Sequence, residues 1–371
     1  MGVALAAEEG ERKRPASTQR IALPSDTGVV GQRSTEPFSL LGLSWDDPAA
    51  SPSGTVEARA RDARTGSWSP WLRLQSHGHG PVGDARSARG ASEPVWVGSS
   101  DGVELRVTRE GEARTELPRG ARLDLIDPGA DGGAEAREGA REAADGQPSI
   151  VSRAGWGADE RLLPPGAEPG DPSTLPEYNT DVKAVFVHHT AGTNDYGCAE
   201  SPAIIRAIHE FHVRVNGWKD IGYNFLVDKC GTVFEGRKGG IDKPVLGAHT
   251  LGFNRESSGV AVLGHHVAVP ASQETSAAVA AVAAWKLGQY GADPAGTATL
   301  LASATQTNYF RKPFKAGDSY EFSRISSHRD GVDTECAGDR LYDQLPLIRQ
   351  LASDPTDHSQ PTHDAGRTPP G

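Results

Sequence analysis

The chain has 371 residues, a length that allows two domains or three small ones. Its 44 glycines, 26 prolines and hydrophobic share of only 36% predict that part of the chain is linker or tail. No segment approaches the roughly 18 consecutive apolar residues of a membrane-spanning helix, which excludes membrane insertion, and the formal net charge of −11 argues against a nucleic-acid partner.

The first 35 residues are polar and rich in turn formers, and they show no sustained hydrophobic period. We therefore predict a disordered N-terminal segment over residues 1–35. The apolar start from Met1 to Ala7 is short, lacks a preceding basic region and is followed by acidic residues, so a signal peptide is not evident. Either the true start lies upstream, or the chain begins near a cleavage site.

Residues 36–128 consist of short, often alternating apolar segments separated by Pro, Gly, Ser and Asp. In the clearest of them, Val103, Leu105 and Val107 alternate with polar residues, which is typical of a half-buried strand. Such segments predict a β-rich N-terminal domain with a small, sandwich-like all-β fold. The predicted strands are residues 38–45, 55–61, 68–74, 94–97, 103–108 and 122–126.

Four tryptophans in this β-rich segment allow two interpretations. They are Trp45, Trp68, Trp71 and Trp96. An exposed group of them would offer flat faces on which sugars stack, whereas tryptophans of a small β domain more often pack in its core. We favour the core interpretation, because it is the more frequent one for tryptophans in small β domains.

Residues 129–150 form the predicted boundary between two domains. The stretch 129–148 contains no large apolar residue and cannot form a core, so we predict a flexible linker. After it, residues 151–352 alternate strand-like and helical patterns, which predicts an α/β domain with a mixed central β-sheet flanked by helices. Residues 353–371 show no pattern and are predicted to be a disordered tail.

Several elements of this α/β domain can be placed. Residues 182–187 predict a buried strand that ends at His188, and a helix is expected to start at Ser201 and Pro202. Further predictions are a hairpin over 223–227 and 232–235, a strand over 260–263, helices over 277–287 and 341–351, and a plain surface loop over 294–317.

Eight of the 12 histidines fall between His188 and His328, and Cys336 follows the last of them. Imidazole and thiolate ligands suit Zn²⁺, and three protein ligands leave the fourth position for water. The sequence therefore raises the question of a zinc site, although composition alone does not identify its ligands.

Four of these histidines have simpler interpretations. His209 and His212 are three residues apart, which is not the spacing of a His-Glu-x-x-His motif, and His212 lies on the apolar face of the predicted helix. We interpret His212 as buried and structural, and His209 as structural or on the surface. The pair His265 and His266 follows a predicted strand and lies either on the surface or along a substrate groove.

Five ordered motifs resemble the peptidoglycan recognition protein family. They are VHHTAG at 187–192, FH at 211–212 with GWKDIGYNFLV at 217–227, GTVFEGR at 231–237, GAHT at 247–250 and SHRD with TECAG between 327 and 338. The resemblance covers roughly residues 151–350, and that family shares its fold with zinc N-acetylmuramoyl-L-alanine amidases of the phage lysozyme type. Residues 37–128 resemble the β-rich module that precedes this domain in actinobacterial secreted amidases.

The resemblance implies a site and an activity. It makes His188, His328 and Cys336 the ligands of a zinc ion, Tyr223 the active-site tyrosine and Thr334 the residue beside the water. The implied reaction is zinc-dependent hydrolysis of the amide bond between N-acetylmuramic acid and L-alanine in peptidoglycan. The alternative is a peptidoglycan-binding module with little or no turnover.

Further residues of the motifs are expected near the substrate. His189, His249, Thr250 and Arg237 are the candidates, with His189 alternatively structural because neighbouring residues at a strand end point to opposite sides. Members that prefer diaminopimelate-type stem peptides often continue Glu-Gly-Arg with Gly-Trp, whereas Arg237 is followed here by Lys-Gly-Gly. The sequence therefore leaves the stem-peptide preference open.

The two remaining cysteines, Cys198 and Cys230, do not match the metal pattern. One precedes the long predicted helix and the other lies in the hairpin turn, positions that could bring them together, so we predict a disulfide. A disulfide implies an oxidising compartment. We accordingly expect a secreted protein, extracellular or associated with the cell wall.

Overall fold

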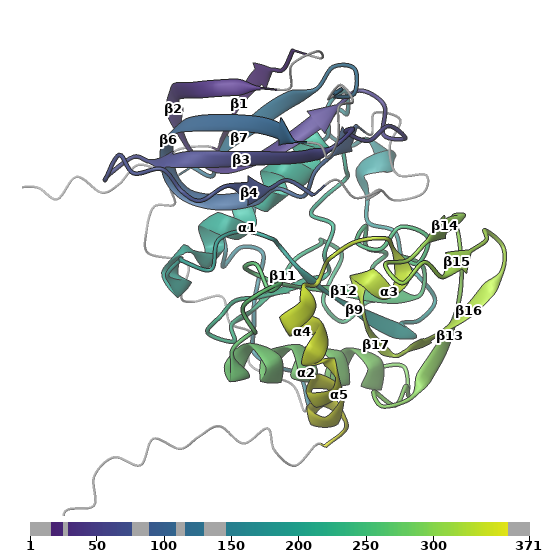
Figure 1. The fold of residues 1–371 in the computed structure, drawn as a ribbon. Coiled ribbons are helices and arrows are strands. Elements are labelled where there is room, and N and C mark those ends of the chain that lie inside the picture. The colour runs from purple at the N-terminus through teal and green to yellow at the C-terminus, as the bar shows by residue number, and fades with distance from the viewer. Residues whose placement is uncertain (1–15, 25–28, 76–88, 109–115, 130–145, 355–371) are drawn as a thin grey trace, which may run out of the picture.

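The computed structural model describes residues 16–24, 29–75, 89–108, 116–129 and 146–354. Four layers lie one above another in Figure 1: an N-terminal sheet, helix α1 (Ser201–Glu210), a central sheet, and a layer of helices α2 (Gln273–Gly288) and α5 (Leu345–Ser353). Helix α1 is thus enclosed between two sheets. The tail from residue 355 and most of the predicted linker lie outside the described residues.

The N-terminal sheet has seven antiparallel strands. Their order is β1-β7-β2-β6-β3-β4, and β5 pairs with β2. The strands are β1 (Ser17–Ala22), β2 (Val30–Trp45), β3 (Thr55–Asp62), β4 (Leu72–Arg73), β5 (Gly90–Ala91), β6 (Val95–Thr108) and β7 (Arg122–Asp127). Inward-facing residues of these strands share one apolar core, as the alternating pattern predicted for an all-β fold.

The observed strands differ from the predicted ones: only Leu72–Arg73 of the predicted strand 68–74 is a strand, and β5 was not predicted. Strand β1 and the first part of β2 lie where a disordered segment was predicted, because β1 is stabilised by pairing with β7 about 100 residues later. Residues 94–97 and 103–108 fall largely on one strand, β6, whose pairing with β2 shifts register between them. The intervening glycines and serines end the apolar pattern without ending the strand.

The tryptophans of this sheet do not form a common exposed face. Trp45 and Trp96 are buried, while Trp68 and Trp71 are partly buried. The Arg59 guanidinium lies over both of the latter rings, 5.2 Å and 4.8 Å from their centroids. This arrangement agrees with the core interpretation for the first pair and leaves the second pair covered by an arginine.

The central sheet is mixed, as predicted. Its order is β17-β9-β12-β10-β11-β8, with only β10 and β11 antiparallel. The strands are β8 (Ile150–Val151), β9 (Ala184–His189), β10 (Phe225–Val227), β11 (Val233–Glu235), β12 (Ser257–Val262) and β17 (Ile325–Ser327). The predicted hairpin is therefore present, and β9 is a buried interior strand, paired with β17 and β12, although it is second from the edge rather than central.

Helices cover both faces of this sheet. On one face α1 and the π-helical turn Phe211–Val215 that continues it form one apolar core, and on the other face α2 and α5 form a second. Pro202 lies in the first turn of α1, and the Ser272 hydroxyl accepts the N–H of Thr275 at the start of α2. The predicted last helix is divided into α4 (Asp339–Asp343) and α5, with Pro346 in the first turn of α5.

The segment 294–317, predicted as a plain surface loop, is structured. It contains β13 (Thr297–Leu301), β14 (Gln306–Thr307) and β15 (Pro313–Phe314), and β13 pairs with β16 (Ser319–Ser323). The buried rings of Phe314 and Phe322 pack with Phe253 and Phe186 in a separate apolar cluster. The loop prediction was wrong because the aromatic partners of Phe314, which are Phe186, Phe253 and Phe322, lie outside the segment.

Cys198 and Cys230 are joined by a disulfide, as predicted. It links the turn before α1 to the hairpin between β10 and β11, with a sequence separation of 32 residues. We expect the double variant Cys198→Ala/Cys230→Ala to lose roughly 3–4 kcal/mol of unfolding free energy, since the cross-link restricts the unfolded chain. Urea unfolding of both proteins measures this; equal midpoints and slopes would contradict it.

The N-terminal sheet packs directly on α1. Leu40, Trp96 and Ile126 belong to the same buried cluster as Ile208 and Phe211.

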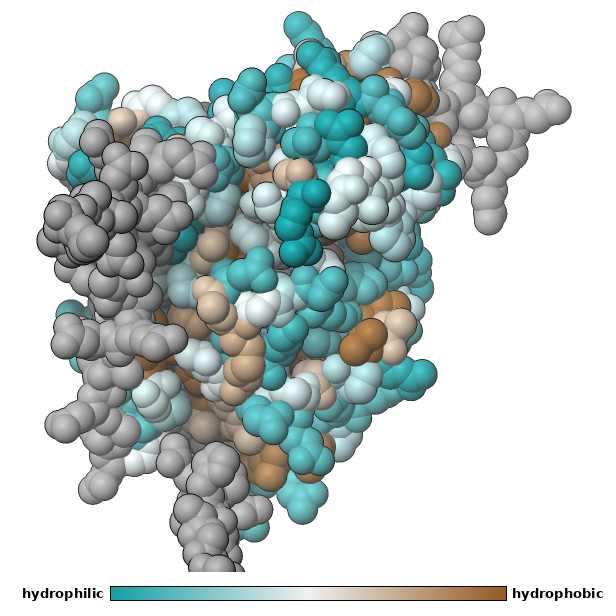
Figure 2. Space-filling view, turned by 90° about the vertical axis from the view of Figure 1, so that its left-hand side faces the viewer, coloured by the Kyte–Doolittle hydropathy of each residue, from teal (hydrophilic) through white to brown (hydrophobic). Residues whose placement is uncertain are grey.

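Polar and apolar residues are interspersed on the face shown in Figure 2, where brown is confined to small patches. Within the described residues, no helix combines the length and apolar character needed to cross a membrane.

Candidate metal centre

Two histidines meet because their strands are parallel neighbours. His188 lies at the end of β9, and His328 follows β17, whose Ser327 pairs with Val187. Parallel strands end at the same edge of a sheet, so the two imidazoles come together, with ring centroids 4.5 Å apart. The ligand atoms of His188, His328 and Cys336 all lie within 4.8 Å of one another, and all three residues are buried.

Cys336 is held at this edge by a short, closed loop. The backbone N–H of Arg329 donates to the Cys336 carbonyl at 2.9 Å, so the chain returns to the start of helix α3 (His328–Gly331). The N–H of Cys336 donates to the Thr334 hydroxyl oxygen at 3.0 Å, and the Asp330 carboxylate accepts the N–H of Ser327 at 2.8 Å. These bonds place the thiol beside the two imidazoles.

His188 has its two ring nitrogens in different environments. Its Nδ1 lies 3.9 Å from the Cys336 sulfur, and its Nε2 lies 3.2 Å from Nδ1 of His249. The hydroxyl oxygen of Thr250 lies 2.9 Å from that same His249 nitrogen. His249 and Thr250, which were expected near the substrate, are both buried and lie against His188.

His189 and Arg237, the other two residues expected near the substrate, are also buried. The N–H of His189 donates to the Cys336 sulfur at 3.2 Å, and its Nδ1 accepts the N–H of His266 at 3.2 Å. Arg237 donates to the Ile221 carbonyl at 3.3 Å. The alternative that His189 is structural agrees with these contacts, and the stacked ring of His265, 5.4 Å away, is only partly buried.

The chemistry of the three donors fits Zn²⁺. Two imidazoles and one thiol form a set of borderline and soft ligands, and three ligands leave a position for water or substrate. Burial raises the pKa of the Cys336 thiol well above its ordinary value, so a protonated thiol is favoured until a divalent cation displaces the proton. The sequence-predicted ligand set is therefore brought together in a form that a zinc ion could use.

Tyr223 lies against the same centre. Its ring centroid is 5.3 Å from that of His188, and the residue precedes β10 on the neighbouring part of the sheet. The phenolic O–H donates to the Glu93 carboxylate at 3.3 Å. Burial, reinforced by the negative charge of Glu93, raises the pKa of Tyr223 well above its ordinary value, so the phenol keeps its proton at neutral pH.

His209 and His212 are not among the three clustered donors, although the ring of His212 lies 5.7 Å from that of Tyr223. His209 Nε2 lies 2.8 Å from the Asp220 carboxylate, and that carboxylate also pairs with Arg153 at 3.2 Å. His212 Nδ1 accepts the N–H of Gly222 at 3.1 Å. These contacts fix the chain that leads into Tyr223.

Asp220 should be a major source of stability. Burial alone would raise its pKa, but Arg153 and His209 outweigh burial and hold the pKa well below its ordinary value. We expect Asp220→Asn to lower the unfolding free energy at pH 7 by about 3–5 kcal/mol, because the buried Arg153 guanidinium loses a buried carboxylate partner. Urea unfolding measures this difference, and a loss below about 1 kcal/mol would contradict it.

The difference should also depend on pH in one direction. A depressed carboxylate pKa contributes stability above the unfolded-state pKa of about 4 and loses it at lower pH. The gap between wild type and Asp220→Asn should therefore be complete at pH 7 and shrink as the pH falls below about 4. Unfolding curves at several pH values check this, and a gap that widens in acid would be inconsistent with it.

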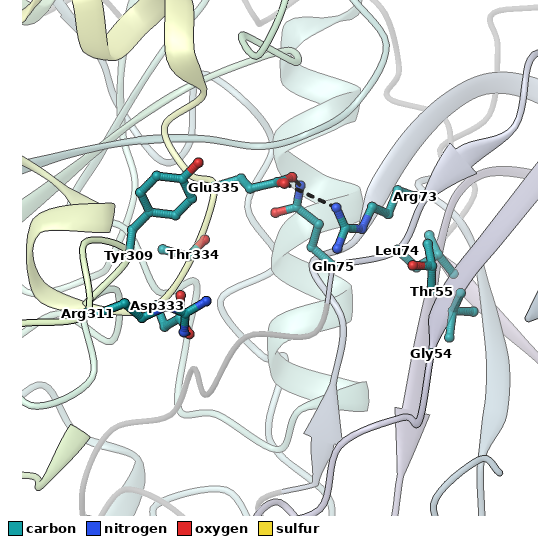
Figure 3. A pocket seen from close by; sticks show the side chains of 11 residues that line it. Gly54, Thr55, Arg73, Leu74, Gln75, Tyr309, Arg311, Asp333, Thr334 and Glu335 are labelled. Atoms are coloured by element: carbon teal, nitrogen blue, oxygen red, sulfur yellow. Dashed lines mark hydrogen bonds and ion pairs between the residues drawn. The ribbon is translucent and has the colours of Figure 1, made fainter. Parts of the chain in front are cut away.

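A cleft of about 300 Å³ lies beside the centre, between the N-terminal sheet and the loop that carries Cys336. In Figure 3, Glu335 points from that loop toward Arg73 and Gln75 of the N-terminal sheet. Glu335 pairs with Arg73 at 3.1 Å and accepts the amide of Gln75 at 2.7 Å. Thr334 also lines the cleft, so the cleft reaches the residue two before Cys336.

Comparison with known proteins gives matches to both halves of the chain. The family described as N-acetylmuramoyl-L-alanine amidase matches residues 178–339, and the family described as Rv3811 N-terminal galactose-binding domain-like matches residues 6–139. Peptidoglycan recognition protein 1 of Bos indicus is 30% identical over 213 residues, which cover 55% of this chain and 87% of that protein. The chain belongs to the peptidoglycan recognition protein family.

Other peptidoglycan recognition proteins and amidases match in part. Human peptidoglycan recognition protein 3 is 33% identical over 33% of this chain and 31% of its own length, and human N-acetylmuramoyl-L-alanine amidase is 31% identical over 55% and 29%. The chain thus spans about a third of the length of these two relatives. The solved structure of Drosophila PGRP-LB aligns with a TM-score of 0.38 and 24% identity over 53% of this chain and 91% of that chain.

Three acidic residues near the metal centre were not among the site residues predicted from sequence. Glu93 and Glu335 connect the N-terminal sheet to the metal centre, and Asp220 supports the chain before Tyr223. Asp220 stands within the quoted GWKDIGYNFLV motif, so the motif itself could have drawn attention to it. Glu93 has no such signal, because its partner Tyr223 lies 130 residues away in the other half of the chain.

Proposed function

We propose that this protein is a zinc-dependent N-acetylmuramoyl-L-alanine amidase that acts on peptidoglycan. The observation that carries the proposal is the complete set of three buried donors, His188, His328 and Cys336, with their ligand atoms within 4.8 Å of one another. Relatives that share this family include proteins named as recognition proteins and proteins named as amidases. Loss of the Cys336 thiol would remove the zinc site. Its presence therefore favours the amidase over a binding module without turnover.

We assign roles to residues around this centre. Zn²⁺ held there would lower the pKa of a bound water and polarise the carbonyl of the scissile amide. Tyr223 would donate its phenolic O–H to the oxygen on which negative charge develops, an interaction that is stronger in the transition state than in the ground state. Thr334, which borders the cleft, would lie beside the attacking water.

The buried pair behind His188 would act on its orientation. With Nε2 of His188 beside His249 and Thr250, Nδ1 is the nitrogen left facing Cys336 and the proposed ion. A second partner of this kind fixes the ring and tautomer of a metal-binding histidine. We therefore propose that His249 and Thr250 position His188 and do not contact the substrate.

The catalytic unit in this proposal is residues 151–352, preceded by the linker predicted at 129–150 and by a β-rich unit that includes β1 and all of β2 and so begins before residue 36. The substrate is peptidoglycan, with its glycan strand and stem peptide. The disulfide between Cys198 and Cys230 supports a location outside the cytoplasm, in an oxidising compartment where peptidoglycan is present.

Analysis of released peptides tests the proposal. The zinc-loaded full-length chain should release peptides that begin with L-alanine from purified peptidoglycan, and mass spectrometry identifies these products. A chelator should stop the release, and added Zn²⁺ should restore it. A zinc-loaded chain that sediments with peptidoglycan but releases no peptide would instead support a binding module without turnover.

A further inference from the structure

The proposed catalytic residues are almost completely sealed in this structure. The exposed fraction is 0% for His188, 4% for Tyr223, and 3% for both Thr334 and Cys336. A scissile amide that belongs to a polymer must touch several of these groups at once. In this structure the cleft of about 300 Å³ reaches Thr334, while the side chains of His188, Tyr223 and Cys336 stay buried.

The seal comes from the N-terminal sheet. The carbonyl of Trp96, in β6, accepts the N–H of Thr193 at 2.9 Å, just after the strand that carries His188. A Cβ atom placed on Gly192 would lie 2.9 Å from Cβ of Trp96, so the two halves touch without a gap at this point. Glu93 precedes β6 and is itself buried against Tyr223.

Glu93 makes the contact that a substrate would need. A carboxylate oxygen accepting the Tyr223 O–H at 3.3 Å has the same charge and hydrogen-bonding character as the oxyanion formed during amide hydrolysis. A phenol has one O–H, so Tyr223 cannot donate fully to Glu93 and to a substrate oxygen at once. This competition argues against a role for Glu93 in turnover.

We propose that the N-terminal sheet closes the amidase centre and that Glu93 occupies the position of the substrate oxygen. The inference rests on the proposed function for the identity of that substrate. The segment is part of the same chain, so the closure is autoinhibitory. Substrate must displace the Glu93 carboxylate before Tyr223 can act on an amide.

The contacts between Glu335 and the N-terminal half, at the edge of the cleft, differ in kind from the contacts that join the two halves of the chain. At the edge, Glu335 binds Arg73 and Gln75, and both members of the ion pair are substantially exposed. Exposed ion pairs are weak and are screened by salt. Further back, Leu40 and Ile126 pack with Phe211 in a dry core. The Glu335 end of this edge can therefore open while Trp96, which belongs to the same dry core as Leu40 and Ile126, keeps the two halves joined.

Alkylation of Cys336 measures this opening without any assay of activity. The chain has three cysteines, and two of them form the disulfide, so Cys336 is the only thiol to react. The metal-free full-length protein is treated with iodoacetamide under native conditions, and intact mass gives the rate. Gln75→Ala should react about threefold faster or more, because it weakens the edge without changing the charge near the thiol.

Two variants at Glu93 separate the effect of its charge on the alkylation of Cys336 from the effect of its size. Glu93→Gln and Glu93→Ala both remove the carboxylate charge, but only the alanine variant also removes the covering group. Cys336 should therefore react faster in Glu93→Ala than in Glu93→Gln, and faster in both than in wild type. Glu104→Ala, which breaks an ion pair with Arg59 elsewhere on the same sheet, is the matched control and should react like wild type.

Peptide release then distinguishes this inference from the proposed function. Zinc-loaded Glu93→Ala should release stem peptides several-fold faster than wild type. Unchanged alkylation rates in all the edge variants, or slower release by the Glu93 variants, would overturn the closure. Faster alkylation with no release by any variant would support the closure and refute the amidase.

Discussion

Replacing Cys336 with alanine should abolish both zinc binding and the release of stem peptides. The thiol is one of the three donors of this centre, whose ligand atoms lie within 4.8 Å of one another, and two imidazoles alone do not complete a catalytic zinc site. Metal analysis of the purified variant should give well below one zinc per chain, whereas wild type should approach one. Mass spectrometry of digested peptidoglycan should show no peptide beginning with L-alanine.

The matched control removes the other two cysteines. Cys198→Ala/Cys230→Ala loses the disulfide but leaves the ligand set intact, so this variant should bind zinc and retain turnover at temperatures where it is folded. If Cys336→Ala kept full zinc content and full turnover while remaining folded, the assignment of the metal centre would be wrong.

Tyr223→Phe should lower kcat by roughly 10²–10³, the usual cost of losing one donor to a developing oxyanion. The zinc content should not change, because the phenol is not one of the three donors. KM should change much less than kcat, since the interaction forms mainly in the transition state. Initial rates on a soluble muropeptide, with metal analysis of the same sample, provide the measurement.

The same substitution also removes the hydrogen bond to Glu93. If closure by Glu93 limits the wild-type rate, part of the loss in Tyr223→Phe will be offset by easier opening. The comparison is therefore made in a Glu93→Ala background as well, where the full cost of removing the phenol should appear. A folded, zinc-loaded Tyr223→Phe with wild-type kcat in both backgrounds would remove Tyr223 from the mechanism.

The parts of the fold that sequence predicted are those with a local cause. The apolar run before His188, the N-terminal Ser201 and Pro202 of α1 and the hairpin after Tyr223 each carry their signal within a few residues. The three metal donors were found through motifs, and the parallel pairing of β17 with β9 explains why distant motifs meet.

The parts that sequence did not predict depend on distant contacts. Strand β1 exists because it pairs with β7, and the segment 294–317 is ordered because its aromatic residues pack with Phe186 and Phe253. Glu93 reaches Tyr223 only because the two halves dock, and neither half alone carries a pattern that indicates this docking. Periodicity describes which face of an element is apolar but not which partner covers it.

The close approach of strand β2 to the turn that follows α1 limits which residues can be combined in the two halves of the chain. A Cβ atom on Gly42 would lie 2.5 Å from two ring carbons of Phe211, so residue 42 can gain a side chain only if residue 211 becomes smaller. Recombination that exchanged either half for that of a distant homologue would separate this matched pair. An exchange of either half should therefore be best tolerated when residues 42 and 211 remain a matched pair.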